Sequence, residues 1–346
     1  MVNLFIISGI VKLIEPTIIT KKYWKGGFLE SYDFIPSSTL TGGIISYINR
    51  NSPKPSNEKE LLKLLKERNI RIWISHAFPY EGDKIDVLDP LPLPISTVAI
   101  AENTEYVSYA LLIAKYHMGE KELIKRISRL NFKVPRGFFL IKNDRAVMFK
   151  VKDWYVYTHV ALDHERRTAA EKLLYTIESL NSGNSFAFKG VLDEATLDEI
   201  KGGLEIRLGM KKSAGYGLSK VEICDYMPIS KYIEKRAGQI GKFKEKIVTV
   251  DVVTYSYVDR ILSLKMEMVF HKMYVSNEKA FVINKFNLYK NVIHPGSVFV
   301  FKRDKDPYDL AKIEVSLPSD PFEMIHGLNM LYFNNPFHFK FSIRGD

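Results

Sequence analysis

The sequence predicts an α+β fold built from two related domains. One pattern, Gly-x-x-Phe-x-Phe-Lys, begins at Gly183 and again at Gly296 with the same spacing. Each copy is followed by an acid-rich helical stretch and then by a glycine-containing turn into a strand. Strands interleaved with two helices per unit are typical of the ferredoxin-like split βαβ arrangement, which RNA-recognition domains also use. We therefore expect a first ferredoxin-like domain over residues 1–225 and a second, degenerate one over residues 226–346.

Composition limits the classes of protein to consider. The chain has 346 residues and 46% hydrophobic content, enough for one large or two medium domains with their own cores. Its net charge of +10 and pI near 9.3 favour a polyanionic partner, although many lysine-rich proteins have none. The single cysteine, Cys224, excludes an internal disulfide and a thiolate zinc site, and it fits a reducing cytoplasm.

The first elements follow from apolar runs and a helix-start signal. The stretch 4–14 is apolar but interrupted, and it is too short to span a bilayer, so we expect a buried first strand and no membrane contact. Pro36 ends an extended segment, and Ser37, Ser38 and Thr39 follow it. Their hydroxyl groups can cap the first turn of a helix, and the same helix terminus could bind a phosphate.

The remaining elements follow the alternation of apolar runs and turn residues. We expect strands at 70–74, 154–162 and 183–189, helices at 58–68 and 192–201, and either a helix or a second extended segment at 168–179.

Two stretches are strongly basic. Residues 120–145 predict a helix followed by a hairpin arm, within an insertion spanning roughly residues 78–150. The arm is either a solvated charged face or an RNA contact, and we favour the RNA contact. Residues 231–246 read as a basic, glycine-containing linker at the domain boundary.

Residues 207–223 carry the strongest functional signal. The segment holds Gly209, Lys211, Lys212, Ser213, Gly215, Tyr216 and Gly217 and ends in a strand-like run. Glycines let backbone amides approach a ligand and turn toward an anion, lysine and serine bind phosphates, and tyrosine stacks on bases. The segment therefore predicts a nucleic-acid clamp. A plain glycine-rich turn entering a strand is the alternative, and the motif orders of mononucleotide and dinucleotide loops are absent.

Histidines are the candidates for acid–base chemistry. His76, His159 and His164 could assist RNA cleavage if they lie near a phosphate with a suitable pKa. The chain has no H-E-x-x-H and no Gly-Gly-Asp-Asp, so we expect no metal and no cofactor. We expect His159 to be a core or RNA-contacting residue rather than a ligand, and Asp33 to be a loop or capping residue.

Several segments in order resemble the RAMP superfamily of CRISPR effector subunits. They are IPSSTLTG (35–42), ISHAFPY (74–80) with LPLP (91–94), HVALD (159–163) and the loop ending in SAGYG (213–217). The resemblance covers roughly residues 1–225 and extends more weakly to the end of the chain. One departure is DHERR at 163–167, where the family usually has Asp-Arg-x-Thr-Gly.

The resemblance implies a function and a set of contacts. ISHAFPY, LPLP and HVALD look most like the type III subunit, particularly of type III-D, that grips the crRNA 5′ handle and caps the backbone filament. This implies a non-catalytic, cytoplasmic RNA-binding subunit in antiviral defence, with crRNA and other RAMP and large subunits of a type III complex as partners. The alternative is a metal-independent endoribonuclease acting on precursor crRNA. The expected RNA-contacting residues are Lys211, Lys212, Ser213, Gly215, Tyr216, Gly217, Ser37, Ser38, Thr39, His159, His164, Arg166 and Arg167.

Overall fold

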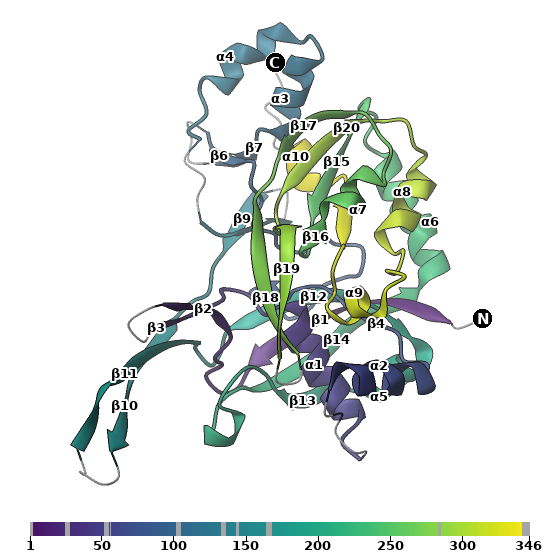
Figure 1. Ribbon diagram of the computed structural model, residues 1–346. Coiled ribbons are helices and arrows are strands. Elements are labelled where there is room, and N and C mark those ends of the chain that lie inside the picture. Colours follow the sequence, from purple (N-terminus) through teal and green to yellow (C-terminus); the bar gives the residue numbers. More distant parts are fainter. Residues whose placement is uncertain are drawn as a thin grey trace.

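Strands in several sheets, covered by helices, form the molecule (Figure 1). The computed structural model describes residues 3–24, 28–51, 55, 57–101, 105–132, 136–142, 145–163, 168–282 and 285–340. The mixed α+β class predicted from the sequence is confirmed. Within the described part of the chain, no helix is long and apolar enough to cross a membrane.

The first sheet has the strand order β13-β14-β1-β12-β4, and β5 also pairs with β12. Its strands are β1 (Leu4–Leu13), β4 (Ile72–Ile74), β5 (Phe78–Pro79), β12 (Ser185–Asp193), β13 (Leu204–Arg207) and β14 (Leu218–Pro228). All neighbouring strands are antiparallel. The central strand β1 is largely buried, as its apolar run predicts.

Two helices belong to this sheet, and both begin near the predicted positions. Helix α1 (Ser37–Ile48) lies between β1 and β4 in the chain and starts directly after Pro36, but no side chain caps it. Helix α5 (Glu194–Ile200) follows β12 and is capped by Asp193, whose carboxylate accepts from the Thr196 amide. The predicted helix at 58–68 is α2 (Glu58–Glu67). With β1, β4, β12 and β14 taken as the four main strands and α1 and α5 as the helices, the unit reads in chain order strand, helix, strand, strand, helix, strand.

A second sheet, with the order β10-β11-β3-β2, contains a long hairpin that projects from the body of the molecule (Figure 1). Its strands are β2 (Thr20–Trp24), β3 (Phe28–Ser31), β10 (Trp154–Asp163) and β11 (Thr168–Leu180). The segment 168–179, undecided from the sequence, is thus extended and pairs with β10 along most of its length.

The insertion around 78–150 holds a compact part formed by residues 98–131, which we call the knob, and a short hairpin formed by residues 138–149. Its elements are β6 (Val98–Ile100), β7 (Tyr106–Ser108), α3 (Ala110–His117), η1 (Lys121–Leu123), α4 (Ile124–Ile127), β8 (Phe138–Lys142) and β9 (Arg145–Phe149). The knob has a small core of its own that includes Val107, Leu112 and Leu130. Helical turns followed by a hairpin match the prediction for residues 120–145.

The second half repeats the arrangement of the first sheet. Its four-stranded sheet has the order β17-β20-β15-β21, with all neighbours antiparallel. The strands are β15 (Ile247–Val252), β17 (Met268–Lys272), β20 (Val298–Lys302) and β21 (Leu331–Phe333), and α7 (Val258–Leu262) and α8 (Pro307–Glu314) lie between them in the chain. The two copies of the sequence repeat fall in β12 and β20, which hold corresponding positions in the two sheets.

A three-stranded sheet and two short helices complete the second half. They are β16 (Ser256–Tyr257), β18 (Val275–Val282), β19 (Lys285–Ile293), α9 (Pro321–Ile325) and α10 (Pro336–Lys340). Like β10–β11 in the first half, β18–β19 is a hairpin between the second and third strands of its unit.

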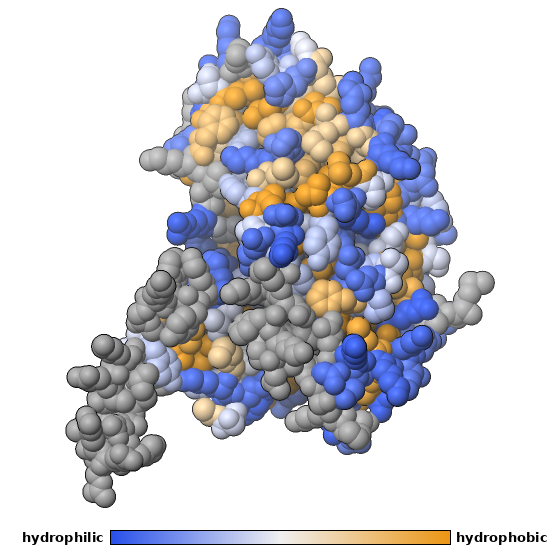
Figure 2. All heavy atoms as spheres, viewed as in Figure 1, coloured by the Kyte–Doolittle hydropathy of each residue, from blue (hydrophilic) through white to orange (hydrophobic). Residues whose placement is uncertain are grey.

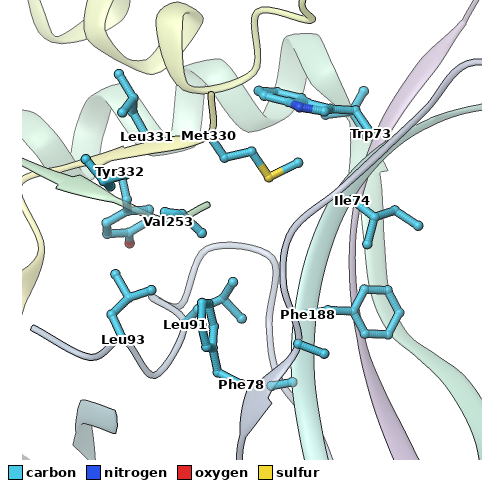
Figure 3. Packing of buried hydrophobic residues seen from close by; sticks show 14 of the residues in the cluster. Trp73, Ile74, Phe78, Leu91, Leu93, Phe188, Val253, Met330, Leu331 and Tyr332 are labelled. Atoms are coloured by element: carbon cyan, nitrogen blue, oxygen red, sulfur yellow. The ribbon is translucent and has the colours of Figure 1, made fainter. Parts of the chain in front are cut away.

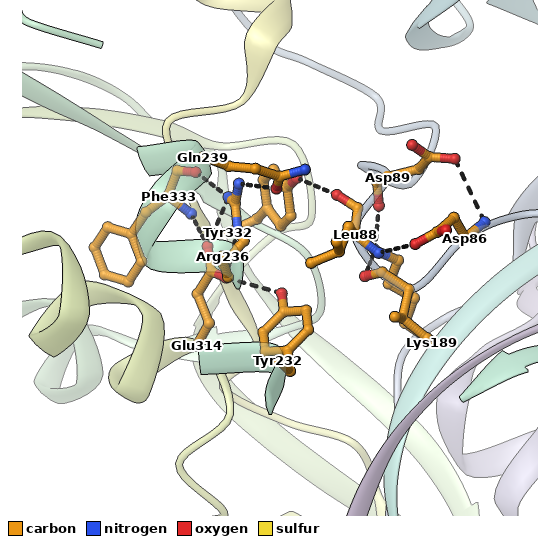
Figure 4. A network of polar contacts seen from close by, with 11 residues as sticks. Asp86, Leu88, Asp89, Lys189, Tyr232, Arg236, Gln239, Glu314, Tyr332 and Phe333 are labelled. Carbon is orange, nitrogen blue, oxygen red and sulfur yellow. Dashed lines mark hydrogen bonds and ion pairs between the residues drawn. The ribbon is translucent and has the colours of Figure 1, made fainter. Parts of the chain in front are cut away.

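The prediction of a linker at 231–246 is wrong, because most of this segment is helix α6 (Ile229–Gly241). The helix buries Tyr232, Arg236 and Ile240 on one face. The Arg236 guanidinium pairs with Glu314 of α8, with Nε 2.9 Å from the carboxylate, and Tyr232 donates to the same carboxylate (Figure 4). The basic composition hides an amphipathic helix whose arginine is part of the interior.

One continuous core joins the two halves (Figure 3). Trp73 of the first sheet is fully buried, and its indole N–H donates to the Leu328 carbonyl in the second half at 2.9 Å. Lys189 of β12 is also buried. It donates to the carbonyls of Val87 and Asp89 in the first half, and its ammonium lies 5.8 Å from the centre of the Tyr332 ring in the second half (Figure 4). The halves are therefore fixed against each other by apolar packing and by buried polar contacts.

Candidate nucleic-acid interface

The glycine-rich segment is the loop that joins β13 to β14. It contains a short 3-10 turn, η2 (Lys212–Ala214). Gly209, Gly215 and Gly217 have positive φ, and so does Lys211. A β carbon at Gly209 or Gly217 would collide with a backbone carbonyl, whereas one at Gly215 would point into open space. Gly209 and Gly217 are therefore required by the close packing of the turn. At Gly215 the missing side chain leaves the backbone accessible from solvent.

The loop is anchored to the segment that follows β1. Arg207 pairs with Glu15, with Nη1 2.5 Å from the carboxylate, and also donates to the Tyr216 carbonyl. This hydrogen bond from Arg207 lowers the pKa of the Glu15 carboxyl. Backbone amides of Met210 and Gly217 donate to carbonyls of the same segment at 2.9 Å. The base of the loop therefore has a defined position, while Lys212, Ser213 and Gly215 at its tip are exposed.

The loop meets the projecting hairpin in a cluster of tyrosines. The Tyr216 ring lies edge-on to Tyr157 of β10, with centroids 5.9 Å apart, and Tyr157 lies 5.8 Å from Tyr155. The Lys211 ammonium is 3.3 Å from the Tyr175 hydroxyl of β11 and 5.1 Å from the centre of its ring. We call these four tyrosines and Lys211 the tyrosine platform.

The strand period places the platform on one face of the hairpin. Tyr155 and Tyr157 are two residues apart, so both point to the same side of β10. In the strand register, His159 is paired with Tyr175 of β11. Burial, followed by the nearby Tyr216 and Tyr155, raises the pKa of Tyr157, so its hydroxyl stays protonated and can donate a hydrogen bond. Tyr155 is 46% exposed, which leaves a ring accessible from solvent.

This combination of groups suits an unpaired nucleic-acid strand. Aromatic rings offer stacking surfaces to bases of any sequence, and lysines with exposed backbone amides offer partners to phosphates. Both kinds of group occur here within one surface, because the loop and the hairpin come together.

The predicted phosphate site at the start of α1 lies elsewhere, against the second half of the chain. The Ser37 amide donates to Nδ1 of His76 at 2.9 Å, and the Ser37 hydroxyl donates to the carbonyl of His326. Ser37 is buried, while Ser38 and Thr39 are half-buried. The structure thus uses the polar groups of Ser37 internally and does not bring them to the loop.

His76 occupies the interior. It is 1% exposed and packs against the rings of Phe34 and Tyr255 at centroid distances of 4.9 and 5.0 Å. Burial lowers the pKa of His76 to about 3, so the ring is neutral near pH 7. A buried neutral imidazole of this kind does not reach an RNA phosphate. Asp33 is an exposed loop residue ahead of α1, as expected.

Other predicted contacts fall outside the described residues. These are His164, Arg166 and Arg167, and the side chain of His159 also lies outside them. Among the described residues, no group of histidine, cysteine, aspartate and glutamate could hold a metal ion.

Tyr155 and Tyr157 are not among the binding candidates predicted from the sequence. Their signal is a Tyr-x-Tyr pair in an expected strand, which places both rings on one face. That pattern does not reveal the segment toward which the face points. Only the fold shows that it points toward residues 211–216.

The fold and this surface define an α+β protein with a partly exposed cluster of aromatic and basic side chains, a candidate interface for nucleic acid. The model of the RAMP superfamily matches residues 23–221, more than half of the chain. The chain belongs to the RAMP superfamily.

Comparisons of the structure give distant neighbours. A chain of the type III-B Cmr-beta complex bound to cognate target RNA and AMPPnP has a TM-score of 0.44 and 16% identity, over 89% of this chain and 90% of that one. A chain of Cmr-beta bound to cognate target RNA has a TM-score of 0.42 and 14% identity, with the same coverage. A chain of the apo Cmr-beta structure has a TM-score of 0.33 and 12% identity, over 63% of this chain and 97% of that one. No curated protein matches the sequence.

Proposed function

We propose that this protein is a non-catalytic crRNA-binding subunit of a type III CRISPR interference complex, which holds the crRNA 5′ handle and caps the backbone filament. The observation that carries the proposal is the tyrosine platform, where the anchored glycine-rich loop meets the projecting hairpin. Membership of the RAMP superfamily supports it, and so does the net charge of +10. The type III-D-like subgroup rests on the sequence motifs.

The proposed mechanism is sequestration of a single strand. Bases of the handle stack on exposed rings such as Tyr155 and Tyr216, each stacked base contributing about 1–3 kcal/mol. Lys211, Lys212, Ser213 and the open backbone at Gly215 bind phosphates. Stacking and phosphate contacts position the RNA but do not cleave it, because cleavage needs a titratable group beside the scissile phosphate.

We also infer that the chain consists of two ferredoxin-like domains divided near residue 225. The support is topological, because the two sheets have the same strand order. The order β14-β1-β12-β4 in the first sheet corresponds to β21-β15-β20-β17 in the second, so that in both the first strand lies between the third and the fourth and the second lies beyond the third. A helix follows the first and the third strand of each unit. Helix α6 would then connect the domains and pack on α8 of the second.

The alternative is a metal-independent endoribonuclease acting on precursor crRNA. Such an enzyme needs a titratable group beside the scissile phosphate. His76 is buried and neutral, which leaves this alternative with His159 and His164 among the three histidines considered.

One experiment separates the two functions. Purified protein is incubated with 5′-labelled repeat RNA, with and without EDTA, and both the shift of the RNA and its length are followed on gels. We expect a shift without shortening, and a weaker shift for Tyr157→Ala. Clean cleavage in the presence of EDTA that is lost in His159→Ala would instead establish the endoribonuclease.

A further inference from the structure

A groove of about 520 Å³ opens between the knob and the second half of the molecule. Its lining comes from the end of α3, the start of β17 and the end of β20, namely His117, Met118, Glu267, Met268, Val269 and Lys302. None of these residues belongs to the tyrosine platform. The groove joins three segments that are far apart in the sequence.

Exposed apolar side chains lie at this groove and at the far end of the outer strand β17. Met118 is 40% exposed and Met268 39% exposed, and Met273, Tyr274 and Val275 follow with exposures of 41 to 50%. In Figure 2, hydrophobic side chains gather in the upper part of the view, over α3 and β17. We call these five residues the methionine face. Apolar side chains gathered on one part of a surface mark an interaction site more often than single exposed apolar residues do.

The backbone at this edge is protected against the addition of a strand. β17 is the outermost strand of its sheet, but its pairing with β20 has a bulge between Met268 and Phe270. The Lys272 carbonyl accepts a hydrogen bond from the Ser96 hydroxyl at 3.1 Å. Bulges and capped backbone groups discourage strand pairing, so a partner would dock on side chains instead.

The surroundings of the methionine face are strongly basic. Segments 115–129, 242–246, 265–275 and 302–305 carry thirteen lysines and arginines against five acids. Lys115 of the knob pairs with Glu245 at 2.8 Å, and Lys302 pairs with Glu267 at 2.6 Å, so two of these acids are neutralised locally. Both basic stretches noted in the sequence, 120–145 and 231–246, contribute to this rim.

Charge and composition select the occupant. A second copy of the chain would bring the same basic rim and be repelled, whereas an acidic surface is attracted. RNA is also acidic, but it gains little from five exposed apolar side chains. Methionine is enriched in the centres of protein–protein interfaces, because its flexible side chain adapts to an apolar partner.

We propose that the methionine face is the docking surface for a protein neighbour with an apolar centre and an acidic rim. This inference rests on the proposed function in one respect, since the neighbour is expected to be another subunit of the same complex. The platform and the methionine face would then divide the molecule into an RNA end and a protein end (Figure 1).

The test uses Met118→Gln with Met268→Gln, two changes at partly exposed positions. The tagged chain is co-produced with its complex, and native mass spectrometry measures which subunits remain bound. We expect the double variant to lose one protein neighbour, with occupancy reduced at least about tenfold. A control double variant, Leu262→Gln with Tyr308→Gln, changes exposed apolar residues on α7 and α8 and should keep every neighbour.

RNA binding by the isolated chain is measured in parallel and separates the two proposals. The RNA affinity of the isolated Met118→Gln, Met268→Gln variant should stay within about twofold of the wild-type affinity. Retention of all neighbours by that variant would overturn the docking surface. A loss of RNA affinity by the isolated variant would show that the face binds RNA instead. If the wild-type chain binds no RNA but the Met118→Gln, Met268→Gln variant still loses its neighbour, the proposed function fails and the docking surface stands.

Discussion

At the scale of single residues, burial decides what a side chain does even where the sequence repeats. Lys189 and Lys302 end the two copies of the same pattern. Lys189 is buried, and the loss of hydration lowers its pKa to about 7. Lys302 lies at the surface and pairs with Glu267. The first lysine holds a loop in the interior, and the second borders the methionine face.

The lysines of the loop give a direct test of phosphate contact. Replacing Lys211 and Lys212 with alanine should weaken RNA binding, since each phosphate contact releases counterions. The slope of log K against log salt should flatten by up to about two in the double variant. Fluorescence anisotropy at several salt concentrations measures this slope.

A matched control for the loop lysines lies on α2. Lys59→Ala with Lys63→Ala removes two exposed lysines that the proposed function does not use. The control should keep the wild-type slope. Equal slopes for all three proteins would mean that the loop does not contact phosphate.

Two buried histidines make stability depend on pH. Burial lowers the pKa of His76 to about 3 and that of His326 to about 4. Both values lie below the value of about 6.5 expected in the unfolded chain. As the pH falls below 6.5 the unfolded state takes up protons first, so the free energy of unfolding decreases toward pH 4 and below. Above 6.5 this contribution is fully present.

His326 allows this dependence to be measured. Its ring lies 4.3 Å from Phe322, and neither ring nitrogen has a hydrogen-bond partner among the described residues. His326→Phe should therefore fold and should lose up to about 3 kcal/mol of the decrease between pH 6.5 and 4. Urea unfolding at pH 7.0 and 4.5 gives the difference. The exposed substitution His117→Gln should leave it unchanged, and an unaltered pH dependence in His326→Phe would contradict the assignment.

At the scale of elements, the loop shows how one glycine differs from the next. Gly217 and Gly215 both have positive φ, but only Gly217 faces a backbone carbonyl, that of Leu208. Gly217 is therefore needed to close the β13–β14 hairpin. Gly215 is needed only for its backbone conformation and lies beside open space.

Alanine at these two positions should have different effects. Gly217→Ala should lower stability by more than the roughly 1–2 kcal/mol that a left-handed conformation alone costs. Gly215→Ala should cost about that amount, and Gly215→Asn less, since asparagine tolerates positive φ. Thermal unfolding of the three variants checks the order. A larger loss for Gly215→Ala than for Gly217→Ala would contradict this account of the loop.

Much of the fold could be predicted from local signals. The apolar run of β1, Pro36 ahead of α1 and the two copies of the repeat each fix one element in its place. Helix α6 could not be recognised, because its lysines and glycines resemble a linker and its buried arginine is balanced only by Glu314, far along the chain. Residues 168–179 were ambiguous because only pairing with β10 decides that they are extended.

The candidate site was predictable only in part, because it also depends on contacts between segments that are far apart in the sequence. The loop residues stand together in the sequence, so their chemistry could be read directly. The platform depends on Tyr157 meeting Tyr216 and on Lys211 meeting Tyr175, which are contacts between distant segments. Such contacts depend on tertiary packing and leave no local pattern.

At the scale of the whole molecule, the shared core fixes the two proposed surfaces relative to each other. Trp73 and Leu328 join the halves inside, and Tyr32 donates to Glu278 across the same boundary at 3.3 Å. The projecting hairpin lies at one end of the molecule, and the knob with β17 lies at the other (Figure 1). In the proposed function, RNA binds at one end of the molecule while a protein neighbour docks at the other.

This arrangement predicts that the isolated chain binds RNA weakly and that the assembled complex protects the RNA from ribonuclease. Alone, the platform encloses few bases, so electrostatics supplies most of the affinity and sequence preference is modest. In a complex reconstituted with a backbone subunit and crRNA, the handle should resist added ribonuclease. Protection should require Lys211, Lys212 and Tyr216, because these residues contribute the phosphate contacts and one of the stacking rings. Ribonuclease footprinting of wild-type and variant complexes measures it. A handle that stays fully digestible, or protection confined to the 3′ end of the crRNA, would place this protein at another position in the complex.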